Sequence, residues 1–429
     1  MNVYLDSIGC RLNQSEIETL AAQFRSAGHT LVENSADADM VVLNTCSVTK
    51  AADADSRKKV RQAARAGNEQ IVVTGCWATL DPESAASLPG VVQVVSNAEK
   101  EHLAARVLNM PPGHFTAQRA APKPRRALPG SQARTRVFIK AQDGCDNHCT
   151  YCVTRIVRGA ARSRPLNEVL EDIQSARLGG AQEVVLTGVH LASWGQDFGS
   201  GTNLGQLVEA VLAASDVPRL RLSSLESWDL DESFFSLWQD ARLCRQLHLP
   251  LQSASGAVLQ RMGRRPTPQA YAALVRDARA AIPEMAVTTD IIVGFPGEST
   301  AEHQESLDFV KEIGFAGGHV FSYSPRPGTP AAQMLDDVPK AVKKERSAQM
   351  RALLAESERR FQEQFRGRVL PVLWESTAKV EDGTWQLKGL SDNYLRVRAA
   401  AAENLWNQIS QVRIRQVKGR DLMGEIVNQ

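Results

Sequence analysis

The sequence predicts an α/β protein with three parts: an N-terminal parallel-sheet domain, a central partial barrel and a small C-terminal β-barrel. Apolar, β-prone runs alternate with helical stretches over the first hundred residues and again from residue 136. After residue 367 the pattern changes to short strands with little helix. At 429 residues the chain is also too long for one compact core.

Residues 1–110 form the first predicted domain. The runs MNVYLDSIG, DMVVLNT and EQIVVTG each precede a few small residues and a helical stretch, a pattern typical of a parallel sheet covered by helices. Residues 111–135 are rich in Pro, Ala and Arg without periodicity, so we expect a linker there. No acidic residue lies between Glu101 and Asp143, and this cationic stretch fits either a solvated linker or a phosphate contact.

Residues 136–366 carry six further strand and helix units. Their strands are VFIKAQ, EVVLTGVHL, RLRLSSLE, QLHLPLQS, VTTDIIVGF and GGHVFSYS. Six such units suit a (β/α)6 barrel or partial barrel, with the functional loops at the strand C-termini. Residues 339–366 predict one long charged helix that bridges to the last domain. In residues 367–429 the runs RVLPVLWES, TWQLKGL, NYLRVRA and QVRIRQVKG predict the small β-barrel.

Bulk composition excludes some classes of protein. No apolar run approaches the roughly 20 residues of a membrane helix, and the N-terminus lacks the features of a secretory signal. We therefore expect a cytoplasmic protein without a membrane partner. The net charge of +2 does not decide for or against nucleic acid. Seven cysteines in such a chain favour metal or catalytic use over disulfides.

Cys145, Cys149 and Cys152 lie in GCDNHCTYC, directly after the strand VFIKAQ. Iron–sulfur clusters are usually held by four cysteine thiolates, so three ligands on one loop leave one iron of a four-iron cluster open. S-adenosylmethionine can bind that iron through its amino and carboxylate groups, and one electron from the cluster then breaks its sulfonium bond to give an adenosyl radical. The sequence therefore predicts a radical enzyme.

A zinc site is the alternative at this loop. His148 would then be the fourth ligand, although the paired C-x2-C pattern of structural zinc sites is missing. Tyr151, on the same loop, fits either stacking on adenine or ordinary packing.

A second set of three cysteines lies in the first domain. Cys10, Cys46 and Cys76 each end an apolar strand, in YLDSIGC, VVLNTC and VVTGC. The carboxyl ends of parallel strands share one edge of the sheet, so we expect the thiolates to converge and hold a second cluster. Its open iron would hold a sulfur species. Cys244, in LCRQLHLPLQS, has no such context and is interpreted as a core residue.

With both sets placed, the chain resembles the methylthiotransferase family of radical S-adenosylmethionine enzymes over essentially its whole length. The resemblance rests on the following motifs: GCRLNQSE, NTCSVT, TGC, GCDNHCTYC, HLPLQSASGAVLQRMGRRPT, DIIVGFPGE and HVFSYSPRPGTPA. It implies an N-terminal cluster domain, a radical S-adenosylmethionine barrel and a C-terminal RNA-binding domain of the TRAM type.

GCRLNQSE and NTCSVT look most like the branch that modifies N6-threonylcarbamoyladenosine at tRNA position 37, at the adenine C2–H bond. Sister branches act on isopentenyladenosine in tRNA and on a ribosomal-protein aspartate. A rival of another class is an RNA-binding protein stabilised by zinc.

The resemblance also implies cofactors and partners. Two [4Fe-4S] clusters are expected, the radical cluster on Cys145, Cys149 and Cys152 and the auxiliary cluster on Cys10, Cys46 and Cys76. One S-adenosylmethionine would supply a methyl group and a second the radical. The tRNA anticodon stem-loop, an electron donor such as flavodoxin or ferredoxin, and a sulfur source would be partners. Further cofactor contacts are expected at strand ends, namely Gly188, Glu226, Asp290 and Gly294. Each of these also fits a turn, a helix cap or a buried hydrogen bond.

Basic residues near the cluster loop and in the last domain are candidates for phosphate contacts. Arg155, Arg158, Arg162 and Arg164 follow the loop directly, and a solvated basic face is their plain alternative. The C-terminal candidates are Arg368, Lys388, Arg396, Arg398, Arg413, Arg415, Lys418 and Arg420. One departure from the family is VTRIVRG, where Arg155 and Ile156 stand in the places of a proline and an aromatic.

Overall fold

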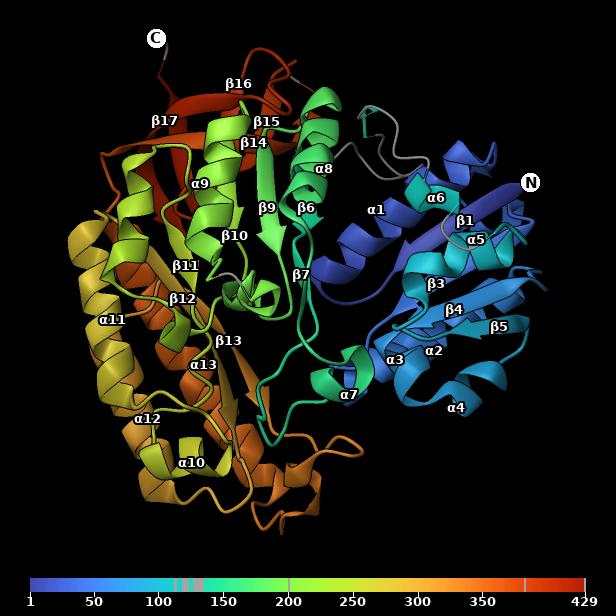
Figure 1. Cartoon of the computed structure of the whole chain (residues 1–429). Coiled ribbons are helices and arrows are strands. Elements are labelled where there is room, and N and C mark those ends of the chain that lie inside the picture. Colours follow the sequence, from blue (N-terminus) through green and yellow to red (C-terminus); the bar gives the residue numbers. More distant parts are fainter. Residues whose placement is uncertain (112–113, 118–122, 126–134, 200, 382, 428–429) are drawn as a thin grey trace.

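The computed structural model describes residues 1–111, 114–117, 123–125, 135–199, 201–381 and 383–427. Figure 1 shows an N-terminal lobe beside a central barrel, and a C-terminal barrel packed on one end of the central one. The expected α/β class is confirmed. Among the described helices, none combines the length and apolar character needed to cross a bilayer.

The N-terminal lobe is a five-stranded parallel sheet in the order β2-β1-β3-β4-β5. Alternate residues of its central strands pack on opposite faces, Val42 and Val72 on one side and Val41 and Val73 on the other. Helices cover both faces, as a parallel sheet requires. The elements are β1 (Asn2–Ser7), α1 (Arg11–Ser26), β2 (Thr30–Leu31), β3 (Met40–Thr45), α2 (Lys50–Arg65), β4 (Ile71–Gly75), α3 (Cys76–Leu80), α4 (Pro82–Ala86), β5 (Val91–Val95) and α5 (Leu103–Val107).

Two three-stranded parallel sheets, β10-β9-β6 and β11-β12-β13, form the central barrel. Isolated bridges between Leu220 and Leu243 and between Ser224 and His248 join the two sheets. This is the expected partial barrel of six strands, with helices outside it (Figure 1). The strands are β6 (Arg136–Lys140), β9 (Glu183–Thr187), β10 (Arg219–Leu222), β11 (Gln246–His248), β12 (Ala286–Val293) and β13 (Gly317–Ser322). The helices are α8 (Leu166–Leu178), α9 (Leu204–Ala214), α10 (Gly256–Arg261), α11 (Pro268–Ala281) and α12 (Thr300–Ile313).

Helix α13 (Lys340–Glu363) packs along β13 and reaches the last domain, where its Phe361 joins the core. There a closed barrel forms in the order β14-β15-β16-β18-β17. Its strands are β14 (Val369–Lys379), β15 (Trp385–Ser391), β16 (Arg396–Ala401), β17 (Ile409–Lys418) and β18 (Asp421–Ile426). The sequence indicated the first four of them. The expected linker contains α6 (His114–Ala117), and part of its cationic stretch, residues 118–122 and 126–134, lies outside the described residues.

The C-terminal barrel is fixed to the amino ends of the central strands. Arg221, fully buried, pairs with Glu183 at 2.7 Å and donates to the Asp392 carbonyl at 2.9 Å. Arg219 donates to the Leu390 and Pro371 carbonyls at 3.0 and 2.7 Å. The loops at the carboxyl ends of the strands therefore lie at the opposite end of the molecule from this barrel (Figure 1).

Candidate active site

The structure brings the three N-terminal cysteines to one edge of the sheet. Cys10 precedes α1, Cys46 follows β3 and Cys76 begins α3, and β1, β3 and β4 are neighbours. Burial raises the pKa of the Cys46 thiol to about 11, and the nearby Cys10 and Cys76 thiols act in the same direction. Side chains this close suit a cluster that several thiolates share.

Gly9 leaves room for this arrangement, because a Cβ at Gly9 would lie 2.5 Å from the Cys46 Cβ and 2.7 Å from its Sγ. We expect Gly9→Ala to displace Cys10 or Cys46 and to cost roughly half of the iron in reconstituted protein. The matched control is Gly28→Ala, in the same lobe and also at positive φ, where an added Cβ meets nothing within 4 Å. Iron and sulfide analysis of both proteins tests this, and equal iron in the two would contradict the role given to Gly9.

Cys145, Cys149 and Cys152 lie on the loop between β7 (Gln142–Asp143) and α7 (Thr154–Arg158). Backbone hydrogen bonds fix this loop, from Cys145 N to the Gly159 carbonyl and from Cys152 N to the Cys149 carbonyl, both at 3.1 Å. Burial raises the pKa of the Cys152 thiol, and Cys145 acts in the same direction. All three residues are half-buried, and Cys152 interacts electrostatically with both Cys145 and Cys149, so the thiols lie near one another.

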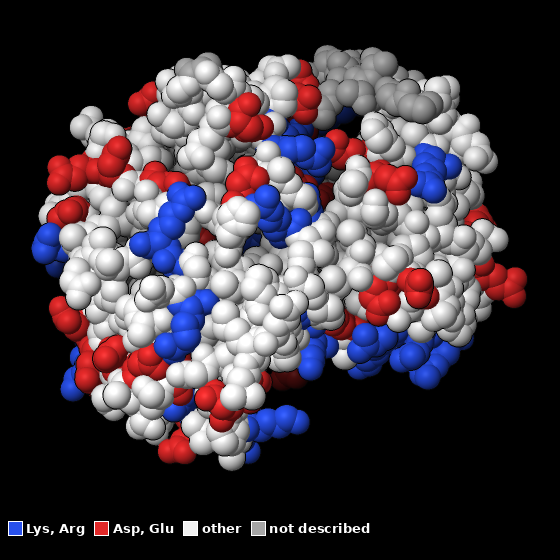
Figure 2. All heavy atoms as spheres, turned by 60° about the horizontal axis from the view of Figure 1, so that its bottom comes forward, with Lys and Arg blue, Asp and Glu red and all other residues white. Residues whose placement is uncertain are grey.

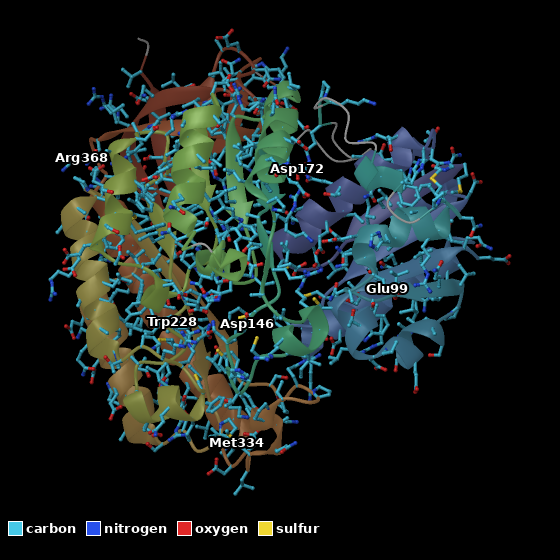
Figure 3. The ribbon with its side chains drawn as sticks, in the orientation of Figure 1. Glu99, Asp146, Asp172, Trp228, Met334 and Arg368 are labelled. Carbon is cyan, nitrogen blue, oxygen red and sulfur yellow. The ribbon has the colours of Figure 1, made fainter. Side chains whose placement is uncertain are left out.

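A cradle of polar groups surrounds this space. Arg264 donates to Glu226 Oε1 at 2.9 Å, lies 4.6 Å from the Trp228 ring centroid and interacts electrostatically with Cys149. Figure 3 shows Trp228 and the loop residue Asp146 at the same end of the barrel. Within the part of the chain that the structure describes, the buried polar atoms here that have no hydrogen-bond partner include Ser223 Oγ, Ser227 Oγ and Trp228 Nε1.

His190 forms a second contact behind the loop. Its Nε2 lies 2.6 Å from Asp229 Oδ2, and its Nδ1 lies 3.4 Å from Asn147 Nδ2. Burial opposes the charge on this ring, yet the Asp229 carboxylate and Cys145 raise the pKa of His190 to about 9. The ring is therefore held in one orientation against the loop.

The remaining candidate cofactor contacts have other neighbours. Gly188 is packed by Gln142, whose Oε1 would lie 2.8 Å from an added Cβ. Asp290 lies 3.2 Å from His319 Nδ1 and 3.4 Å from His248 Nε2. Gly294 faces the Lys343 side chain, and the Tyr151 ring packs edge-on against Phe295 at 6.4 Å. Of the candidates, Tyr151 lies on the cysteine loop itself, and Glu226 is linked to the loop through Arg264, which interacts electrostatically with Tyr151 and Cys149.

His148, the fourth ligand of the zinc alternative, contacts an arginine. His148 is exposed, and its Nε2 lies 2.8 Å from Arg155 Nη1. Across the described ranges, no three His, Cys, Asp or Glu side chains are placed to share one metal ion. A tetrahedral zinc site needs ligands about 2 Å from a single ion, whereas a cluster holds its cysteines further apart.

The two cysteine sets are joined by one buried arginine. Arg158 Nη2 donates to Asn13 Oδ1 at 2.8 Å, and Arg158 Nη1 lies 2.9 Å from both Glu16 Oε1 and Asp143 Oδ1. Asn13 accepts from the Cys10 thiol at 3.8 Å. A chain of contacts thus runs from Cys10 to the strand that begins the other cysteine loop.

This placement changes the expected phosphate contacts. Arg158 is almost wholly buried among carboxylates, and Arg164 pairs with Asp172 at 2.8 Å and Glu168 at 3.3 Å. Both guanidiniums are already bonded inside the protein, which favours a structural role over a phosphate contact.

Arg162 and Arg396 are exposed, and the described residues give neither of them an ion-pair partner. Arg155 is also exposed but donates to the Asp146 carbonyl at 3.3 Å, and so it supports the loop at the place where VTRIVRG departs from the family.

Several functional candidates were missed from the sequence alone. Arg264, Trp228 and His190 lie on loops far from the cysteines in the sequence. The residues around them do not indicate that these side chains approach the cysteine loop. The pair of arginines in MGRRPT was the only available signal. Cys244 is buried, as expected of a core residue.

Comparisons with known proteins agree with this site. The model of the radical SAM superfamily matches residues 139–310, and that of the uncharacterized protein family UPF0004 matches residues 2–97. A threonylcarbamoyladenosine tRNA methylthiotransferase of Bacillus subtilis is 34% identical over 96% of this chain and 93% of its own length. A tRNA-2-methylthio-N(6)-dimethylallyladenosine synthase of Maricaulis maris is 30% identical over 99% and 97%.

Among solved structures, a radical S-adenosylmethionine methyltransferase from Kitasatospora setae aligns with a TM-score of 0.58 at 15% identity. The alignment covers 77% of each chain and supports the fold. With its cysteine sets placed as described and full-length relatives above 30% identity, the chain belongs to the radical S-adenosylmethionine methylthiotransferase family.

Proposed function

We propose that the protein adds a methylthio group to C2 of N6-threonylcarbamoyladenosine at tRNA position 37. The observation that carries this is the pair of three-cysteine sets, which are joined through Arg158. Each set would leave one iron of a four-iron cluster open. The acceptor is supported by the GCRLNQSE and NTCSVT motifs and by the Bacillus subtilis relative.

The residues present fit the cofactors. Cys145, Cys149 and Cys152 would hold the cluster that cleaves S-adenosylmethionine, and Cys10, Cys46 and Cys76 would hold the auxiliary cluster. When bound, these groups supply the radical and the methyl and sulfur atoms. Ser223, Ser227 and Trp228 offer unused donors for the polar groups of S-adenosylmethionine.

Protein residues would hold and shield the bound cofactor. Arg264 would fix Glu226 through their ion pair and cover Trp228. A reduced flavodoxin or ferredoxin and a sulfur donor complete the proposed reaction.

Mass spectrometry of tRNA nucleosides tests the acceptor. In a deletion strain we expect loss of the methylthio mark on threonylcarbamoyladenosine, and its return with the wild-type gene but not with Cys149→Ala. An intact mark would refute the proposal. Loss of the mark on isopentenyladenosine instead would support the second candidate, which the Maricaulis maris relative favours.

Metal content separates the enzyme from a zinc-stabilised RNA-binding protein. We expect anaerobically reconstituted protein to be brown and to contain about eight irons per chain, because each site is expected to hold a four-iron cluster. Elemental analysis and the visible absorption spectrum measure this. Colourless protein with stoichiometric zinc would contradict the assignment.

A further inference from the structure

An open groove of about 720 Å³ lies where the N-terminal lobe meets the end of the central barrel. Lys50, at the start of α2, is its lining residue from the lobe, and the end of β13, the segment after it and the first turns of α13 supply the rest. Its lining includes five cations and one carboxylate: Lys50, Lys340, Lys343, Lys344, Arg351 and Asp336. The groove is therefore strongly positive.

Internal pairing leaves most of this charge unused. Lys343 Nζ forms an ion pair with the Asp336 carboxylate, at 2.6 and 2.7 Å from its two oxygens. Lys50, Lys340 and Lys344 are exposed, and no residue in the described ranges forms an ion pair with them. Such uncompensated cations lining a concave surface attract a polyanion.

A buried hydroxyl adds a second, independent indication of a ligand. Tyr323 lines the groove with only 7% of its surface exposed, and its Oη has no partner among the residues that the structure describes. Buried hydroxyls are normally hydrogen-bonded, so an unused one in a groove marks a place for a ligand atom. The hydroxyls of Ser322 and Ser324 line the same groove.

The groove also adjoins the cysteine loop. The Tyr323 ring packs against Phe295 with centroids 5.1 Å apart, and Phe295 packs against Tyr151 at 6.4 Å. The Ala331 amide donates to the Thr150 carbonyl of the loop at 2.8 Å. The groove and the cysteine loop are therefore connected through one packed cluster of side chains.

We infer that this groove binds backbone phosphates of the substrate RNA next to the modified base. The inference rests on the proposed function and adds to it. The C-terminal barrel lies at the opposite end of the central barrel from the cysteine loop, so the RNA needs a second contact near the loop. Figure 2 turns the loop end toward the viewer and shows Lys and Arg in separate groups on both lobes.

Salt dependence of RNA binding tests the inference. We expect Lys340→Ala/Lys344→Ala to weaken binding of a fluorescein-labelled anticodon stem-loop RNA and to reduce the slope of log K against log salt by about 1.4 to 1.8. Lys50→Ala, from the N-terminal lobe, should reduce it by a further 0.7 to 0.9, approximately. Fluorescence anisotropy on the holoenzyme at several salt concentrations gives these slopes.

Matched variants separate the groove from general charge loss. Lys311→Ala/Arg359→Ala removes two exposed cations outside the groove, which have no ion pair with any described residue, and should leave the slope unchanged. Lys340→Arg/Lys344→Arg keeps the charge and should restore wild-type binding. Tyr323→Phe should weaken binding about threefold to tenfold, the loss of one neutral hydrogen bond, without changing the slope.

If the slope is unchanged in Lys340→Ala/Lys344→Ala while wild-type protein binds RNA normally, the inference about the groove is wrong and the proposed RNA substrate stands. Slower reduction by flavodoxin with unchanged RNA binding would assign the groove to the electron donor and would also overturn it. If wild-type protein fails to bind the stem-loop, both this inference and the proposed RNA substrate fall.

Discussion

Replacing Cys149 by Ala is expected to reduce the formation of 5′-deoxyadenosine to background. Cys149 is the middle cysteine of the loop and a proposed cluster ligand, and its backbone carbonyl accepts a hydrogen bond from the Cys152 amide at 3.1 Å. Loss of a cluster ligand should exceed the roughly 10- to 100-fold loss seen when only a residue behind a metal ligand is removed. The measurement is anaerobic incubation with dithionite and S-adenosylmethionine, followed by chromatography of the products.

The same assay with Cys46→Ala distinguishes the two sites. Because Cys46 belongs to the N-terminal set, this variant should still cleave S-adenosylmethionine while losing methylthio transfer and roughly half of the iron. Cys244→Ala removes a buried thiol outside both sets and should retain both activities. Cleavage that persists in Cys149→Ala would refute the radical-cluster assignment, and methylthio transfer that persists in Cys46→Ala would refute the auxiliary one.

Much of this site could be predicted because cysteine positions follow from strand ends. Cys10, Cys46 and Cys76 lie after three neighbouring strands of one parallel sheet, so topology alone brings them together. The loop spacing of Cys145, Cys149 and Cys152 is local and needs no knowledge of distant contacts. The α/β class and the six barrel strands followed from periodicity in the same way.

Features that depend on tertiary contacts could not be predicted. The strand β18 (Asp421–Ile426) contains Gly424 and charged residues, and it is defined by pairing with β16 and β17 more than by its own apolar pattern. Arg158 and Arg164 look like surface cations in the sequence, yet their partners lie on α1, β7 and α8. The basic groove brings together Lys50 and Lys340, which lie far apart in the sequence.

The junction of the two cysteine sets concentrates these tertiary contacts. Burial by itself would disfavour the Glu16 carboxylate, but Arg158, Lys100 and Lys140 hold its pKa well below the usual range. Asn97 Nδ2 adds a contact of its own, at 2.8 Å from the Val157 carbonyl and 3.6 Å from Cys76 Sγ. The lobe and the barrel are thus held together next to the cysteines, and Arg158 contacts both.

Arg158→Ala is therefore expected to destabilise the protein, because it removes a buried guanidinium from between the Glu16 and Asp143 carboxylates. Lys100 and Lys140 still pair with these carboxylates, so the loss should stay below the roughly 3–5 kcal/mol of a wholly unpaired buried charge. Arg158→Lys should retain part of this stability but lose the second hydrogen bond, to Asn13. Arg162→Ala, an exposed control four residues away, should change stability by less than about 0.5 kcal/mol.

Urea unfolding of the metal-free proteins measures these differences without involving the clusters. If Arg158→Ala unfolds like the wild type, the junction does not hold the lobes together. If it is destabilised as expected, a partly stable Arg158→Lys protein can show whether a loosened junction also separates S-adenosylmethionine cleavage from methylthio transfer. The two reactions would then fall by different factors, because only the transfer requires both cysteine sets to stay at a fixed distance.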